Sequence, residues 1–138
     1  MACGRVRKPL GTGWTPLVDT QLENLQVGAV SLAAGQSHSF HTGEREWAVV
    51  LVRGHCTIST ADRSEFVAGP RPDPFAHKPS GAFVSREETV RVVAREDRLV
   101  AVASAPAEKK TANTYLSSDD VRLVERGEGA WGRCVGFV

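Results

Sequence analysis

Most apolar residues of this chain fall in short segments of strand length that are separated by turn residues. Residues 47–52 (WAVVLV) are apolar throughout, whereas residues 55–60 (HCTIST) alternate between polar and apolar side chains. A continuous apolar run indicates a strand buried on both faces, and alternation indicates a strand buried on one face. The pair Arg53-Gly54 is expected to separate these two strands. Further strands are predicted at residues 27–32, 65–67, 82–84, 89–94, 99–103 and 121–125.

The segments between these strands contain turn-forming residues and no long amphipathic pattern. Residues 69–74 (GPRPDP) are predicted to form a loop, because proline cannot donate to a β-ladder. Residues 36–44 form a polar connection, and residues 117–120 (SSDD) can cap one helical turn. No helical apolar spacing persists over ten residues. The pattern therefore predicts an all-β fold, with antiparallel strands in a sandwich or barrel.

Size and composition add limits to this picture. A chain of 138 residues suits one domain, with residues 1–15 as an N-terminal arm and residues 16–138 as the domain itself. The net charge of +1 comes from scattered acids and bases, which argues against a nucleic-acid partner. No apolar run is long enough to cross a membrane, and the first ten residues lack the apolar core of a signal peptide. Three cysteines without C-x-x-C spacing fit a reducing cytoplasm.

Two segments carry a family resemblance. The first begins at Gly35, continues through a polar turn that contains His38 and His41, and ends in the apolar strand 47–52 and Gly54. This order resembles the first motif of a cupin. The second segment is Val-Ala-Ser-Ala-Pro-Ala at residues 102–107, followed by VxxVERGEG at residues 121–129.

That second segment resembles the end of the first domain in the 5-deoxyglucuronate isomerase family of myo-inositol catabolism. Residues 8–11 (KPLG) resemble the start of the same family, and 5-keto-4-deoxyuronate isomerase is related to it. The resemblance covers nearly all of the chain but only about half of a family member, namely its N-terminal cupin. It implies a single jelly-roll-like cupin barrel, and an aldose–ketose isomerase whose divalent metal is bound in a second cupin that this chain lacks.

The chain departs from the cupin metal motif at each ligand position. Two histidines separated by one residue would face the same side of a strand, but His38 and His41 are three residues apart. Counting back from Gly54, the glutamate position holds Trp47, and Glu46 is offset by one residue onto the other face. The later histidine position holds Val84 or Val90, depending on the alignment. We therefore predict a degenerate metal site, with no metal ligand, cofactor or catalytic residue in this chain.

Four residues are candidates for a ligand pocket: His41, Trp47, Glu46 and His38. Each has an alternative role. The histidines and Glu46 suit a solvated strand end, and Trp47 suits core filling as well as stacking on a sugar. Arg45, Arg53 and Arg86 are candidate partners for a ligand carboxylate.

Three hypotheses for function remain open from the sequence. The chain can be the first domain of an isomerase that needs a second cupin for catalysis, so its own enzyme activity stays uncertain. It can be a non-catalytic cupin that binds a sugar acid or another small ligand. It can also be a structural domain, because burial of residues 47–52 on both faces requires a cover, either a homodimer partner or a second cupin.

Overall fold

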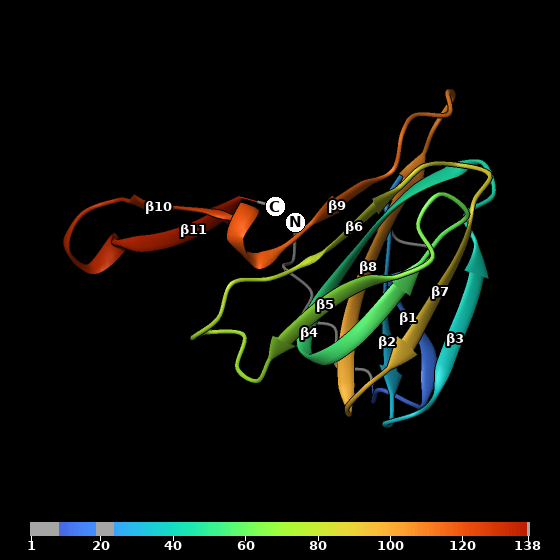
Figure 1. Ribbon diagram of the computed structural model, residues 1–138. Coiled ribbons are helices and arrows are strands. Elements are labelled where there is room, and N and C mark those ends of the chain that lie inside the picture. Colours follow the sequence, from blue (N-terminus) through green and yellow to red (C-terminus); the bar gives the residue numbers. More distant parts are fainter. Residues whose placement is uncertain (1–8, 19–23, 138) are drawn as a thin grey trace.

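The computed structural model describes residues 9–18 and 24–137 of the chain, and the arm predicted at residues 1–15 lies partly outside them. The described residues form eleven strands and two 3-10 helices of three residues each (Figure 1). The strands are β1 (Gly13–Val18), β2 (Gln26–Leu32), β3 (Ser37–His41), β4 (Arg45–Ser59), β5 (Phe66–Arg71), β6 (Gly81–Val84), β7 (Thr89–Ala94), β8 (Arg98–Pro106), β9 (Thr114–Leu116), β10 (Arg122–Arg126) and β11 (Arg133–Phe137). The helices are η1 (Ser118–Asp120) and η2 (Gly129–Trp131).

The first nine strands build two antiparallel layers that enclose one core. One layer has the strand order β1-β2-β8-β4-β6-β9. The other contains β3, β7, the second half of β4, and β5. The prediction of an all-β antiparallel fold is confirmed.

Strand β4 belongs to both layers, which corrects the prediction of two strands separated at Gly54. Its first half pairs with β6 and β8, and its second half pairs with β5 and β7. The register shifts on both sides of Gly54, where φ is +100°. A Cβ atom at this position would lie 2.4 Å from the carbonyl oxygen of Asp97. Glycine therefore lets the strand bend from one layer into the other without ending.

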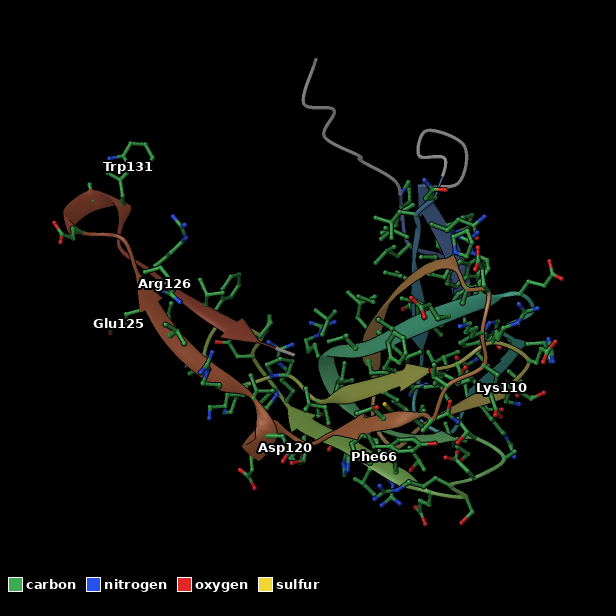
Figure 2. The ribbon with its side chains drawn as sticks, turned by 90° about the horizontal axis from the view of Figure 1, so that it is seen from above. Phe66, Lys110, Asp120, Glu125, Arg126 and Trp131 are labelled. Atoms are coloured by element: carbon green, nitrogen blue, oxygen red, sulfur yellow. The ribbon has the colours of Figure 1, made fainter. Side chains whose placement is uncertain are left out.

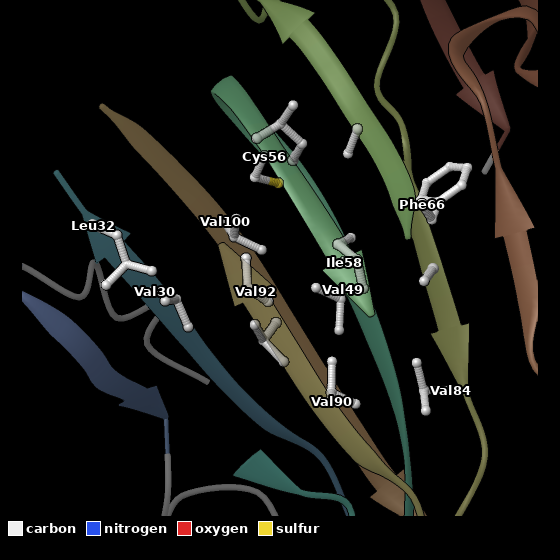
Figure 3. Packing of buried hydrophobic residues seen from close by; sticks show 14 of the residues in the cluster. Val30, Leu32, Val49, Cys56, Ile58, Phe66, Val84, Val90, Val92 and Val100 are labelled. Carbon is white, nitrogen blue, oxygen red and sulfur yellow. The ribbon is translucent and has the colours of Figure 1, made fainter. Parts of the chain in front are cut away.

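The core consists mainly of aliphatic side chains, together with Cys56 and Phe66, that face inward from both layers (Figure 3). On β8 the inward positions are Arg98, Val100, Val102 and Ser104, all buried, while the residues between them are only half-buried. On β4 the inward residues Val49 and Leu51 are fully buried, whereas Ala48, Val50 and Val52 on the outer face are half-buried. The prediction of burial on both faces at residues 47–52 thus holds only for the inner face.

Several element boundaries differ from the prediction. Strand β1 starts at Gly13 and pairs with β2, so the sheet begins before residue 16. The predicted loop at residues 69–74 was wrong for its first half, because β5 continues to Arg71. Pro70 is tolerated there since β5 pairs with β4 alone among the described strands, and an edge strand does not need every donor. The polar residues 36–44 contain β3, which the sequence pattern did not predict.

Strands β10 and β11 form a separate hairpin that projects from the barrel (Figures 1 and 2). Trp131 lies at its tip with 82% of its surface exposed. The predicted helical turn at residues 117–120 is confirmed as η1, where the backbone N–H of Ser117 donates to Asp120 Oδ2 at 2.8 Å. Neither 3-10 helix of the described residues is long enough to cross a membrane.

Candidate functional site

The predicted cupin positions for the glutamate and the later histidine hold Trp47 and either Val84 or Val90, and all three side chains are apolar. Trp47 on β4 pairs directly with Val84 on β6, and Phe40 on β3 pairs with Val90 on β7. The ring centroids of Phe40 and Trp47 are 4.8 Å apart, so the two layers meet here. Val84 and Val90 are fully buried and belong to the core. Aliphatic and indole side chains offer no lone pairs suited to a metal ion, so these positions do not fit a cupin metal site.

A second tryptophan, which the sequence reasoning missed, extends this aromatic cluster. Trp14 on β1 meets Trp47 edge to face, with the ring centroids 5.9 Å apart. Its ring lies over Gly28 of β2, where a Cβ atom would be only 2.2 Å from Trp14 Cη2. A glycine inside an otherwise apolar strand is the one sequence signal for this close approach. The indole N–H of Trp47 donates to the carbonyl oxygen of Thr42 at 3.1 Å, which fixes the ring.

A hollow of about 320 Å³ opens at this aromatic end of the barrel. It is lined by Trp14, Gln26, His38, Ser39, Phe40 and Trp47, and we call it the aromatic hollow. Two of the four predicted pocket residues, His38 and Trp47, therefore lie in one site. The His38 ring is 6.1 Å from the Phe40 ring, so the wall is mainly aromatic.

The other two predicted pocket residues do not line the aromatic hollow. His41 is exposed, and its Nδ1 accepts a hydrogen bond from the backbone N–H of Gly43 at 3.0 Å. His38 is half-buried and His41 is exposed, in agreement with the prediction that they face opposite sides of the strand. Glu46 is half-buried and precedes Trp47 on β4, so its side chain leaves the opposite face of the sheet. A ligand role for these two residues stays a prediction.

Two of the three candidate arginines donate hydrogen bonds to other parts of the chain. Arg45 donates to Ser104 Oγ at 3.0 Å and to the Ser104 carbonyl oxygen at 2.9 Å. Arg86 donates to the Ala107 carbonyl oxygen at 2.8 Å and lies 3.6 Å from a Glu44 carboxylate oxygen. Arg45 thus ties the start of β4 to β8, and Arg86 fixes the connection that follows β8, whereas Arg53 is exposed at the opposite end.

At that opposite end, the sequence reasoning also missed a buried charge. Arg98 is only 2% exposed, and none of its side-chain nitrogens has a hydrogen-bond partner among the described residues. Burial lowers the pKa of Arg98 from its ordinary value. Burial also raises the pKa of the nearby Cys56 thiol to about 11, an effect that the positive charge of Arg98 partly opposes.

A polar cluster on the surface ties β9 to the turn between β4 and β5. Asp62 Oδ1 accepts hydrogen bonds from Thr60 Oγ1 at 2.6 Å, from Tyr115 OH at 2.7 Å and from Asn113 Nδ2 at 2.9 Å. These bonds, with that from Thr60 the strongest influence, lower the pKa of Asp62 to about 2. The Arg63 guanidinium stacks 4.9 Å from the centroid of the Tyr115 ring. Every member of this cluster has a partner within the chain, so we assign it a structural role.

The outer face of the first layer carries an apolar groove. It has a volume of about 330 Å³ and is lined by Ala48, Val50, Gly81, Ala82, Phe83, Thr114 and Leu116. Phe83 is 37% exposed in this groove. Among the described residues there is no group of three or more His, Cys, Asp or Glu side chains that could hold a metal ion.

Two sheets that share one long strand and close around an apolar core define a cupin, or double-stranded β-helix. The Cnp3 cupin domain of Schizosaccharomyces pombe aligns with a TM-score of 0.51 and 11% identity, over 68% of this chain and 64% of its own. KdgF from Halomonas aligns with a TM-score of 0.53 and 14% identity, over 73% and 87%. The predicted cupin fold is confirmed.

Within this class, the chain belongs to the KduI/IolB family, which matches residues 14–137. It is 23% identical to the 5-deoxy-glucuronate isomerase of Bacillus subtilis over 111 residues, which are 80% of this chain and 41% of that protein. An IolB-like protein from Salmonella typhimurium has 28% identity and a TM-score of 0.82, over 92% of this chain and 50% of its own. The family prediction is confirmed, and the chain spans about half the length of these relatives.

Proposed function

We propose that this chain is a non-catalytic cupin unit of a 5-deoxyglucuronate isomerase type of protein, and that it corresponds to the N-terminal cupin. The observation that carries the proposal is the apolar character of the cupin ligand positions, where Trp47, Val84 and Val90 pack into the core. The match to half of each relative also supports it. By its cysteine content, we place the unit in the cytoplasm.

In this proposal, the isomerase chemistry belongs to a second cupin. An aldose–ketose isomerisation needs a metal ion to polarise the substrate oxygens and an acid–base group to move a proton between adjacent carbons. The residues of this barrel do not fit such a metal, so no catalytic step is assigned to them. Their contribution is to present a stable surface to the catalytic unit.

The apolar groove on the outer face is the proposed contact surface. Ala48, Val50 and Phe83 leave apolar area partly open to water, and covering such area is favourable by roughly 25 cal/mol per Å². A second cupin or a second copy of this chain would cover it. A Phe83→Glu variant should then lose this contact, and sedimentation would show the smaller assembly. Val67→Glu, on the exposed side of β5, is the matched control and should sediment like the wild type.

Metal content is the direct test of the non-catalytic role. We expect the purified chain, dialysed without chelator, to contain less than a tenth of an equivalent of manganese, zinc, iron or nickel by elemental analysis. A metal-binding cupin treated in parallel is the control for metal loss. A near-stoichiometric metal content, together with isomerase activity of the chain alone, would overturn the proposal.

The aromatic hollow supports a second candidate function, which is binding of a sugar acid or another small ligand. Trp14 and Trp47 present aromatic faces and edges to the hollow, and pockets of this kind favour the apolar face of a sugar ring. Titration with glucuronate should change the tryptophan fluorescence of the wild type and of Trp131→Leu. The same titration of Trp14→Leu should give no saturable change. An equal response from all three proteins would exclude the hollow as the site.

A further inference from the structure

The buried end of β8 contains a cation that the packing of the barrel does not explain. Arg98 continues the inward row of Val100 and Val102, so its side chain leaves the sheet on the core side. Its backbone pairs with Leu32 of β2, which is itself buried. Gly54 lies so close that a Cβ atom there would be 2.6 Å from Arg98 Cβ.

A guanidinium in this position has a high cost without a counter-charge. It carries five N–H donors and keeps its proton at any ordinary pH, so burial without partners removes hydration that nothing restores. Each side-chain nitrogen of Arg98 is buried and unpartnered within the described residues. None of the four ion pairs that these residues form includes Arg98.

The neighbouring groups of Arg98 do not supply the missing negative charge. The Cys56 thiol is buried, and its raised pKa keeps it neutral at pH 7. Asp97 is exposed, and its Oδ1 accepts a hydrogen bond from the backbone N–H of Ala34 at 2.9 Å. The charge of Arg98 is therefore not balanced by a carboxylate of the described chain.

A polar hollow adjoins this end of the barrel and contains a second arginine. Its volume is about 270 Å³, and its wall includes Thr12, Ser31, Arg53, Asp97 and Arg98. Arg53 is exposed, so it can reach a bound molecule from the solvent side. Two arginines, two hydroxyl groups and the Asp97 carboxylate thus border one small space, and the positive charges outnumber the negative one.

We propose that this end of the barrel binds a small oxyanion, a carboxylate or a phosphate, through Arg98, with Arg53 as a second contact. The planar fork of a guanidinium matches two oxygens of such a group. The oxyanion would supply the counter-charge that the buried arginine lacks, and it would stabilise the folded chain on binding. This anion site is additional to the proposed role as the non-catalytic cupin unit, and it is separate from the aromatic hollow.

Thermal unfolding tests this site in the intact chain. The wild type is heated with increasing acetate, glucuronate or inorganic phosphate, with chloride replaced so that ionic strength is constant. At ten times the dissociation constant, we expect the midpoint to rise by on the order of 5 °C. Equal shifts by acetate and glucuronate identify a simple carboxylate, a larger shift by glucuronate identifies a sugar acid, and a shift by phosphate alone identifies a phosphate group. No shift by any of them overturns the proposal.

Three variants assign the shift to the site. Arg98→Met removes the charge and should abolish the oxyanion shift, while Arg53→Met should weaken the apparent affinity several-fold. Arg91→Met, on the exposed side of β7, removes the same charge and should behave like the wild type. If Arg98→Met retains the wild-type shift, or if Arg91→Met loses it equally, the effect is general screening and the proposal fails.

A fourth variant covers the case in which Arg98→Met does not fold. Arg98→Lys keeps the charge but not the two-pronged geometry, and it should weaken oxyanion binding about tenfold. Unchanged affinity in Arg98→Lys would contradict the assignment. Trp14→Leu should leave the shift intact, which separates this site from ligand binding in the aromatic hollow. Metal analysis of the chain is independent of both results.

Discussion

The two ends of the barrel differ in the side chains that fill their inward-facing positions. At the aromatic end, Trp47 and either Val84 or Val90 occupy cupin ligand positions, Phe40 packs against Trp47, and the indole N–H of Trp47 has a partner. At the other end, Arg98 is buried in an apolar surrounding without a partner among the described residues. The first end is explained by packing alone, while the second is not. A polar ligand is therefore expected at the end of the barrel that lacks the cupin motif.

The largest expected effect is at the aromatic end. Trp47→Ala should lower the free energy of unfolding by roughly 3 kcal/mol, because it removes a large side chain that packs on both Phe40 and the core. Urea denaturation followed by circular dichroism measures the change. Trp131→Ala at the hairpin tip is the matched control and should change it by less than about 0.5 kcal/mol. Equal losses in both variants would show that Trp47 does not anchor this end.

Because the Cys56 thiol is buried at the arginine end of the barrel, the folded chain should lose stability at alkaline pH. The Cys56 thiol has a pKa of about 11 in the folded chain, above its ordinary value near 9. Between these values only the unfolded chain loses the proton, so stability is complete below pH 9 and falls as the pH rises to 11. The loss is roughly 2 to 3 kcal/mol. Cys56→Ala should flatten this part of the pH profile, and Cys134→Ala, on the exposed hairpin, should not.

Removal of the buried charge should raise the free energy of unfolding, whereas most core substitutions lower it. In chloride buffer without oxyanions, Arg98→Met should raise the free energy of unfolding by about 2 kcal/mol, since an unpartnered buried charge is replaced by an apolar side chain of similar length. Arg91→Met should leave it within about 0.5 kcal/mol. Guanidinium chloride denaturation is unsuitable here because the denaturant resembles the side chain, so urea is used. A loss of stability in Arg98→Met would mean that the arginine has a stabilising partner.

The smallest effect concerns the contact between Trp14 and Gly28. Gly28→Ala places a methyl group where the Trp14 ring lies and should displace that ring at a cost of about 1 kcal/mol. Because Trp14 is already 36% exposed, the core behind it should not change. The expected readout is a red shift of tryptophan fluorescence with little change in the unfolding midpoint. Gly11→Ala, where a Cβ atom meets nothing within 4 Å, is the control.

Sequence patterns predicted the strands that carry their own apolar signal. The prediction for β7 was correct at both boundaries, because TVRVVA is rich in β-branched residues. Strand β3 (SHSFH) has a single apolar residue, and β9 (TYL) is only three residues long. These two strands form because β7 and β6 offer them partners, and a local pattern cannot predict such long-range pairing.

The candidate site was predicted only where a motif pointed to it. Trp47 and His38 were predicted from the spacing of the cupin motif, and both line the aromatic hollow. Trp14 lies in a segment rich in glycine that was interpreted as an arm. Arg98 has the same parity as Val100 and Val102, so its inward direction was visible in the sequence. The sequence pattern alone did not predict its burial, because arginine is almost never fully buried without a partner.

The continuous path of β4 has a consequence for how the molecule opens. This strand bonds to β6 and β8 in one layer and to β5 and β7 in the other, so neither layer can separate while the other keeps its ladder. Amide hydrogens on both sides of Gly54 should therefore exchange with solvent at one common free energy, that of global unfolding. Among the described residues, the projecting hairpin shares no strand with either layer, and its amides should exchange far earlier. A single bent strand thus makes two sheets one cooperative unit.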